Sequence, residues 1–193
     1  MADEAANQPW GDWRRQIDVL QSMLLERGYT GLRVEMCGYD PLLAARCINL
    51  RREPTMAFFS REAQLSVKML RKMRAEAREN ECRHLIVVTA EGLTPFAARE
   101  LAETVGEDVV EVFKKRELAF AVTRHVRVPR HHVLSQREKE ELLRRLACDD
   151  AALPKLSPQD PVAKFLQLVP GQVVRVIRTF GTLEPEVYYR VVG

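Results

Sequence analysis

The chain has 193 residues, of which 46% are hydrophobic and 30% charged, and 30 Lys and Arg against 27 Asp and Glu give it a formal net charge of +3. This composition excludes a wholly disordered chain and a polycation, and it suffices for one medium-sized core or two small ones. No apolar run approaches the roughly 20 residues of a membrane span, and the start Met1-Ala2-Asp3-Glu4 lacks the basic beginning of a signal peptide. We expect a soluble, intracellular protein with no membrane contact.

Helices and short strands are predicted to alternate along the first part of the chain. Apolar residues recur at helical spacing up to Arg27, where Gly28 supplies a stop, so a core-facing helix is expected from about residue 12. A loop region with Gly31, Gly38 and Pro41 follows. A short helix is expected at residues 42–45, and a strand is expected at residues 55–59.

The next segment carries a second helix, two further strands and a third helix. Ser60 is expected to cap a helix over residues 61–82, and residues 84–89 form a short apolar run typical of a buried strand. Thr94 as N-cap and Pro95 in the first turn predict a helix that ends at Gly106. A strand at 108–113 and a closing helix at 114–122 complete an α/β domain over residues 1–122.

The last third predicts a second, smaller domain over residues 123–193. Residues 123–132, rich in arginine and histidine, are interpreted as a linker, and Ser135 with Glu138 forms a capping box for a helix to Leu146. Asp160 and Pro161 predict the start of a short helix. Strands at 172–178 and 187–192 are expected to pair, so the whole chain is a two-domain α/β (α+β) protein. A domain this small profits from docking onto a partner.

Sequence motifs for catalysis are missing. There is no Gly-rich phosphate loop, no His-Glu-x-x-His and no Gly-x-Ser-x-Gly, which makes an autonomous enzyme improbable. A nuclease would need an acidic pair and a lysine around a metal ion. Glu111 and Lys114 come nearest to this, but three residues apart on one strand they face opposite sides. The four cysteines, Cys37, Cys47, Cys82 and Cys148, contain no close pair, so we expect no metal site and no cofactor.

Two segments could meet an anion. The N-terminus of the helix at Thr94 and Pro95 offers unpaired backbone donors, with Arg99 one turn on, although an ordinary cap is the more frequent explanation. Residues 124–132 place three arginines and three histidines together, where they could contact phosphates or form a solvated segment between domains. His131 and His132 are adjacent, and no third metal ligand lies at helical spacing from them.

Specific residues in the carboxyl-terminal third carry a resemblance to a known family. These residues are Val128-Pro129-Arg130-His131, Leu134-Ser135, Lys139 to Leu143, Leu153-Pro154, Asp160 to Ala163, Gly171 to Arg178 and Tyr189-Arg190-Val191. In their order and spacing the chain resembles the fifth-largest common subunit shared by eukaryotic nuclear RNA polymerases I, II and III, a family that also has a shorter archaeal counterpart. Upstream, Trp13-Arg14, Arg27-Gly28-Tyr29 and Leu93 to Ala97 resemble the family's eukaryote-specific jaw domain.

The resemblance implies a non-catalytic, nuclear polymerase subunit at the lower jaw, whose second domain docks on the largest subunit beside neighbouring subunits. Its first domain would lie near downstream duplex DNA and guide it through phosphates, and no homo-oligomer is expected. The family's Thr-Pro-Ser-Ala element near DNA maps onto Thr94, Pro95, Phe96 and Ala97, to which we add Arg99. The expected docking residues are Pro129, His131, Asp160, Pro161, Val162, Ala163, Val173, Val174, Val176, Arg178, Tyr189 and Arg190.

Two departures mark the chain as a divergent member. Phe96 replaces the serine of the Thr-Pro-Ser-Ala element, which weakens a hydrogen-bonding role there, and Phe180-Gly181-Thr182 replaces the family's Ser-Glu-Thr. The alternatives to a polymerase subunit are a free-standing DNA-binding transcription regulator that uses residues 123–132, and a nuclease on the α/β domain. A net charge of +3 over 193 residues favours weak binding to bare DNA, as expected of a subunit.

Overall fold

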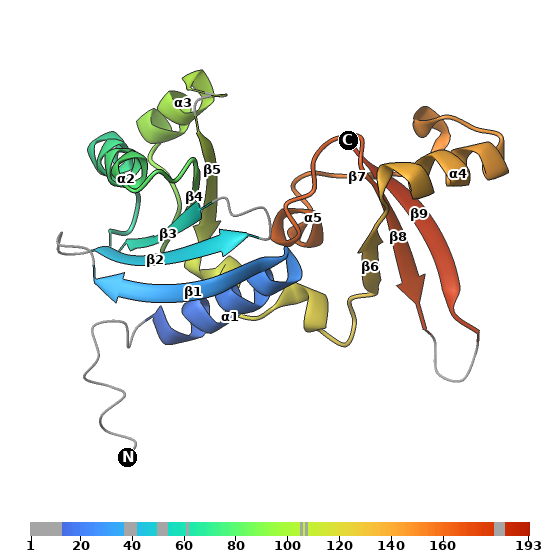
Figure 1. Ribbon diagram of the computed structural model, residues 1–193, viewed down its shortest axis with the longest axis horizontal. Helices are drawn as coiled ribbons and strands as arrows, with labels where there is room; N and C mark the ends of the chain where they lie inside the picture. Colours follow the sequence, from blue (N-terminus) through green and yellow to red (C-terminus); the bar gives the residue numbers. More distant parts are fainter. Residues whose placement is uncertain are drawn as a thin grey trace, which may run out of the picture. The chain divides into compact units, whose positions relative to one another are not determined.

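The computed structural model describes residues 13–36, 42–49, 54–60, 62–104, 106, 108–179 and 184–193. The chain forms two compact units, Met1–Phe120 and Ala121–Gly193, which we call the amino-terminal and carboxyl-terminal units. Both combine helices with a sheet (Figure 1), so the predicted two-domain α/β class is confirmed. In the described part of the chain no helix has the length and apolar character that a membrane crossing requires.

The amino-terminal unit is built on a five-stranded mixed sheet in the order β1-β2-β3-β4-β5. β1, β2 and β3 are antiparallel to one another, whereas β4 and β5 continue from β3 in parallel. The elements in chain order are α1 (Arg14–Glu26), β1 (Tyr29–Met36), β2 (Leu42–Asn49), β3 (Pro54–Ser60), α2 (Val67–Glu79), β4 (His84–Thr89), α3 (Pro95–Glu103), β5 (Val109–Lys114) and the short 3-10 helix η2 (Lys115–Leu118).

Helices cover both faces of this sheet. Figure 1 shows α2 and α3 on one face and α1 on the other. Alternate residues of each strand point to opposite faces. Met56, Phe58, Leu85 and Val87 therefore pack in one core with α2 and α3. On the other face Phe59 meets Trp13, with ring centroids 5.8 Å apart.

Three of the predicted elements in this unit are wrong or shifted. Residues 42–45 lie in strand β2, because β1 and β3 offer pairing partners along both of its edges. Helix α2 begins at Val67 and not after Ser60, since the Ser66 hydroxyl accepts the Met69 N–H at 3.3 Å. The expected closing helix at 114–122 is only η2, where the Glu117 carboxylate folds back to accept the Lys114 N–H.

Other predictions for the amino-terminal unit are confirmed, with small differences at the loops. β4 has the predicted bounds, and α3 has Thr94 as its N-cap and Pro95 in its first turn. Gly31 belongs to strand β1 and not to a loop. Gly38, Pro41 and Cys37 lie outside the described residues.

The carboxyl-terminal unit holds a four-stranded sheet in the order β6-β8-β9-β7. Its elements are η3 (Val122–Arg124), β6 (Arg130–Val133), α4 (Gln136–Leu146), η4 (Asp150–Ala152), β7 (Lys155–Leu156), α5 (Pro161–Phe165), β8 (Val173–Arg178) and β9 (Glu186–Val192). β8 and β9 pair in antiparallel fashion along their length, as predicted. Part of the expected linker is instead strand β6, because residues 130–133 pair with β8.

Two small cores hold the carboxyl-terminal unit together. On one face of β8, Val174 and Val176 pack with Ala163 of α5, and on the other face Val173 packs with Leu142 of α4. The capping box predicted for α4 is present, since Ser135 Oγ accepts the Glu138 N–H and the Glu138 carboxylate accepts the Ser135 N–H. The Ser135 hydroxyl also donates to the Glu138 carboxylate at 2.7 Å, and this hydrogen bond, together with the one from the Ser135 N–H, lowers the pKa of the Glu138 carboxyl.

Candidate partner and nucleic-acid interfaces

The residues predicted to lie near DNA surround the N-terminus of α3. The Thr94 hydroxyl accepts the Ala97 N–H at 3.3 Å, so one helix donor is already satisfied. Ala97 is buried in the core, whereas the Phe96 side chain is 80% exposed. Arg99 is exposed but pairs with Glu103 at 2.9 Å. Of the five predicted residues, Phe96 is therefore the one that presents a large apolar surface to solvent.

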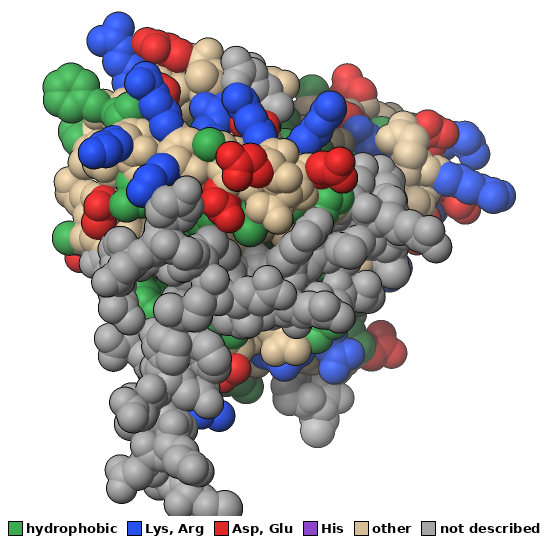
Figure 2. Space-filling view, turned by 60° about the vertical axis from the view of Figure 1, so that its left-hand side comes forward, with side chains coloured by type: hydrophobic (Ala, Val, Ile, Leu, Met, Phe, Trp, Pro, Cys, Tyr) green, Lys and Arg blue, Asp and Glu red, His purple; other side chains and the backbone are tan. Residues whose placement is uncertain are grey.

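The cations of α2 and α3 are interleaved with carboxylates. The Arg71 guanidinium makes two hydrogen bonds, of 2.7 and 2.8 Å, to the Glu100 carboxylate, and these lower the pKa of Glu100. Arg74 and Arg78 both donate to Asp108, at 3.0 and 3.1 Å. Figure 2 shows the result, with Lys and Arg side chains alternating with Asp and Glu across this face. The face is therefore mixed in charge and offers no broad positive surface.

The charge of the chain is concentrated in the carboxyl-terminal unit. Residues 121–193 contain 12 Lys and Arg against 8 Asp and Glu, a balance of +4, whereas residues 1–120 contain 18 against 19, a balance of −1. Longer-range attraction of an anionic partner is thus expected mainly at the carboxyl-terminal unit.

Several predicted docking residues lie inside the carboxyl-terminal unit. Ala163, Val173, Val174 and Val176 are buried in its two cores, and Val162 is also buried. Strand β8 has β6 on one side and β9 on the other, so its backbone is already paired. Docking residues were expected on this strand, but its backbone offers no free edge to a partner strand. Pairing with a partner strand requires a terminal strand of the sheet, which means β6 or the two-residue β7.

The remaining docking residues lie on the surface or cap an element. The Asp160 carboxylate accepts the Val162 N–H at 2.8 Å, and Pro161 opens α5, so both set the start of that helix. Arg178 lies over the ring of Tyr188, 5.2 Å from its centroid. Arg190 donates to the Lys155 carbonyl at 3.1 Å, and Tyr189 packs beside the α4 core.

Pro129 and His131 lie at the free edge of the carboxyl-terminal sheet. His131 is in β6, the first strand in the sheet order, and its Nδ1 atom is 2.8 Å from the Pro129 carbonyl oxygen. Leu134 donates its N–H to Val173 of β8. Because backbone groups alternate in direction along an antiparallel strand, the N–H and C=O of His131 point away from β8.

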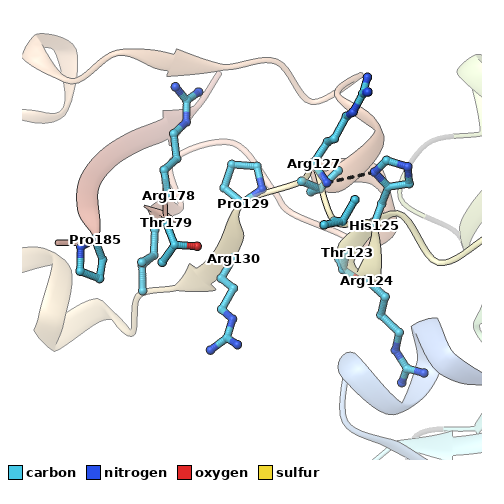
Figure 3. Close-up of a pocket in the computed structure, with 12 residues that line it drawn as sticks. Thr123, Arg124, His125, Arg127, Pro129, Arg130, Arg178, Thr179 and Pro185 are labelled. Atoms are coloured by element: carbon cyan, nitrogen blue, oxygen red, sulfur yellow. Dashed lines mark hydrogen bonds between the residues drawn. The ribbon is translucent and has the colours of Figure 1, made fainter. Parts of the chain in front are cut away.

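A cavity of about 1010 Å³ opens beside β6, and we call it the arginine cavity. Residues 123–130 line one part of it, and Ile177, Arg178, Thr179 and Pro185 line the other (Figure 3). The sequence indicated the basic run at 124–130, but it could not show that the end of β8 lies opposite. That juxtaposition follows from the pairing of Arg130 with Ile177. The predicted departure at Phe180-Gly181-Thr182 lies outside the described residues.

Sequence reasoning missed a buried polar network in the amino-terminal unit. The Arg27 guanidinium makes two hydrogen bonds of 2.8 Å to the Glu111 carboxylate, and His84 Nε2 lies 2.6 Å from the same carboxylate. The hydroxyls of Tyr29 and Thr55 lie 2.9 and 3.1 Å from His84 Nδ1. Because a carboxylate only accepts, the Nε2 atom of His84 is the donor in its contact with Glu111.

This network is a buried, charged contact between the end of α1 and strand β5. The side chains of Arg27 and Glu111 are 3% and 15% exposed. Burial alone raises the pKa of the Glu111 carboxyl, but the His84 hydrogen bond together with the charge and hydrogen bonds of Arg27 outweighs it and lowers the pKa. Glu111 therefore binds the C-terminus of α1 to the edge strand β5, and it is not available to a metal ion as in a nuclease. In the described part of the chain no three His, Cys, Asp or Glu side chains are placed to hold a metal.

Comparisons with known proteins identify the family. The family model described as RNA polymerase Rpb5, C-terminal domain, matches residues 120–192. The proteins named DNA-directed RNA polymerases I, II, and III subunit RPABC1 from Caenorhabditis elegans and Caenorhabditis briggsae are each 33% identical over 135 residues, 70% of this chain. The Dictyostelium discoideum protein of the same name is 33% identical over 135 residues, which cover 69% of this chain and 68% of that protein.

The matches to these relatives are longer than the carboxyl-terminal unit. The aligned 135 residues exceed the 73 residues of the carboxyl-terminal unit, so the similarity continues into the amino-terminal unit. The aligned part of the chain spans 64% of the length of each nematode relative. The resemblance seen in the sequence is thus confirmed, and the chain belongs to the RPABC1 (Rpb5) family of RNA polymerase subunits.

Proposed function

We propose that the chain is a non-catalytic, nuclear subunit of a DNA-directed RNA polymerase. In this proposal the carboxyl-terminal unit docks on the largest subunit, and the amino-terminal unit lies at the lower jaw beside downstream duplex DNA. The observation that supports it most is the 33% identity to RPABC1 relatives over 135 residues, which is longer than the carboxyl-terminal unit alone. A subunit held in a large assembly needs no active site of its own.

Docking is proposed to use the outer edge of β6 at His131, together with Pro129 just before the strand. An exposed strand edge can take up an extended segment of a partner through main-chain hydrogen bonds. The outward N–H and C=O of His131 supply such a donor and acceptor. Arg178 of the neighbouring strand β8 would add a side-chain contact beside this edge, and Tyr189 and Arg190 of β9 would meet the partner farther across the sheet. Asp160, Pro161 and the buried valines act by shaping the unit.

Guidance of downstream DNA is proposed for the N-terminal end of α3. The exposed Phe96 and the first turn of the helix would face the duplex or a neighbouring subunit at the jaw, with Arg99 released from Glu103 to meet a phosphate. The balance of −1 in residues 1–120 and the paired cations of α2 argue for a weak contact that depends on the assembled enzyme. Such contacts carry no sequence information.

Affinity purification of the tagged chain from native nuclear extract, followed by mass spectrometry, tests the proposal. Recovery of several largest subunits identifies a shared subunit, and recovery of one identifies a dedicated isoform. Recovery of none would overturn the proposal.

His131→Pro tests the docking edge in the same experiment. Proline removes the outward N–H but is tolerated at strand edges, so co-purification should fall while the chain stays folded. His131→Ala keeps the N–H and is the matched control. Equal recovery with both variants would exclude pairing along β6.

A further inference from the structure

The arginine cavity gathers four of the 12 Lys and Arg residues of the carboxyl-terminal unit. Arg124, Arg127, Arg130 and Arg178 line it together with His125, and none of its twelve described lining residues is acidic. The Glu186 carboxylate, close by in β9, accepts a hydrogen bond from the Tyr188 hydroxyl and keeps its charge, but Glu186 does not line the cavity. The cavity therefore attracts anions, and it lies in the unit that holds the net charge of +4.

The four guanidinium groups do not converge on one point. Figure 3 shows Arg127 and Arg178 extending to one side, whereas Arg124 and Arg130 extend to the opposite side. A single phosphate would need several donors aimed at one centre. Donors that diverge along a cavity fit instead a ligand that carries several anionic groups spaced along an extended chain.

Apolar side chains lie between these arginines. Val126 is 94% exposed, and Val128, Pro129 and Ile177 also face the cavity. No Phe, Tyr or Trp is among the described lining residues, and His125 supplies the one ring there, so successive unpaired nucleic-acid bases have no row of rings on which to stack. A polypeptide that alternates acidic with apolar side chains satisfies both the cations and the apolar surface. From these observations we propose that the arginine cavity binds an extended acidic segment of a partner protein.

This inference rests on the proposed function in one respect, because the segment is expected to belong to another polymerase subunit. The free edge of β6 begins at Arg130, which itself lines the cavity. A partner strand added along β6 therefore has its continuation directed at the arginines. The acidic residues of the segment would fix its position and direction, since charged contacts at an interface contribute more to specificity and association rate than to affinity.

Fluorescence anisotropy with the full chain tests the cavity directly. The probe is a fluorescein-labelled peptide of about ten residues that alternates Glu with Val, the length of an added strand and its flank. A Gln/Val peptide of the same length and a short duplex DNA are compared with it. The Glu/Val peptide should bind most tightly, and its affinity should fall when salt is raised above about 0.1 M.

Charge reversal locates the binding. The double variant Arg127→Glu/Arg130→Glu should weaken binding of the Glu/Val peptide by about tenfold or more. Both side chains are on the surface, so the fold should be retained, which circular dichroism checks. Arg137→Glu/Arg144→Glu makes the same change of net charge on the exposed face of α4 and should leave the affinity within about twofold.

The other outcomes overturn the inference. Equal weakening by Arg137→Glu/Arg144→Glu would mean that the peptide senses only net charge. Tighter binding of duplex DNA than of the peptide would identify a nucleic-acid site and favour the regulator. If the wild-type chain co-purifies with polymerase subunits but binds no peptide, the cavity inference alone is refuted. If the peptide binds and no subunit is recovered, the proposed function fails and the cavity stands.

Discussion

Glu111→Gln in the buried network should destabilise the amino-terminal unit strongly. The substitution keeps the size of the side chain but removes the Glu111 counter-charge from the Arg27 guanidinium, whose side chain is 3% exposed. Removing one partner of a buried ion pair costs about 3–5 kcal/mol. With a urea dependence of about 2 kcal/mol per M, the unfolding midpoint should fall by about 1.5–2.5 M.

Tryptophan fluorescence is the suitable assay for this effect. The only two tryptophans of the chain, Trp10 and Trp13, belong to the amino-terminal unit, and Trp13 is buried against Phe59. The fluorescence transition in urea therefore reports on this unit and not on residues 121–193. Circular dichroism follows the whole chain in parallel.

Two further variants decide whether buried charge is the reason. Glu100→Gln breaks a similar two-hydrogen-bond pair with Arg71, but the Arg71 side chain is 67% exposed, so the midpoint should barely move. Adding Arg27→Met to Glu111→Gln removes the buried cation as well and should raise the midpoint above that of Glu111→Gln alone. A further decrease in the double variant, or equal effects of Glu111→Gln and Glu100→Gln, would refute the reasoning.

Further expectations concern acid stability, the α4 cap and the exposed face of α3. The folded pKa of Glu111 is lowered, so the stability that the charged Glu111 carboxylate contributes is present above the unfolded pKa of about 4.3 and is lost as the pH falls through the folded value. In an acid titration followed by Trp fluorescence, the unfolding of Glu111→Gln should therefore depend less on pH than that of the wild-type chain. Ser135→Ala should cost about 1 kcal/mol by removing the α4 cap, measured by urea unfolding followed by far-UV circular dichroism. A loss below about 0.3 kcal/mol would mean that water replaces the cap. Phe96→Ser should leave the melting temperature unchanged because Phe96 is 80% exposed, and a drop of several degrees would show that it packs on its own unit.

Elements defined by local chemistry were predicted well. Ser135 with Glu138, Thr94 with Pro95, and Asp160 with Pro161 each predicted a helix start that the structure contains, because a cap is formed by residues within one turn of each other. Elements that depend on distant partners were predicted poorly. Residues 42–45 form a strand because β1 and β3 pair with it, and no local signal at those positions distinguishes this from a short helix.

The sequence by itself determined the two-domain α/β class, the main helix boundaries and, through resemblance, the polymerase-subunit family. Only the tertiary structure decided which residues can meet a partner. It buries Val173, Val174 and Val176 in the unit's own cores, leaves the edge of β6 free, and brings the end of β8 to the basic segment. It also joins Arg27, His84 and Glu111, which are up to 84 residues apart. Sequence patterns report on neighbours along the chain, whereas exposure, strand order and buried ion pairs depend on contacts between distant segments.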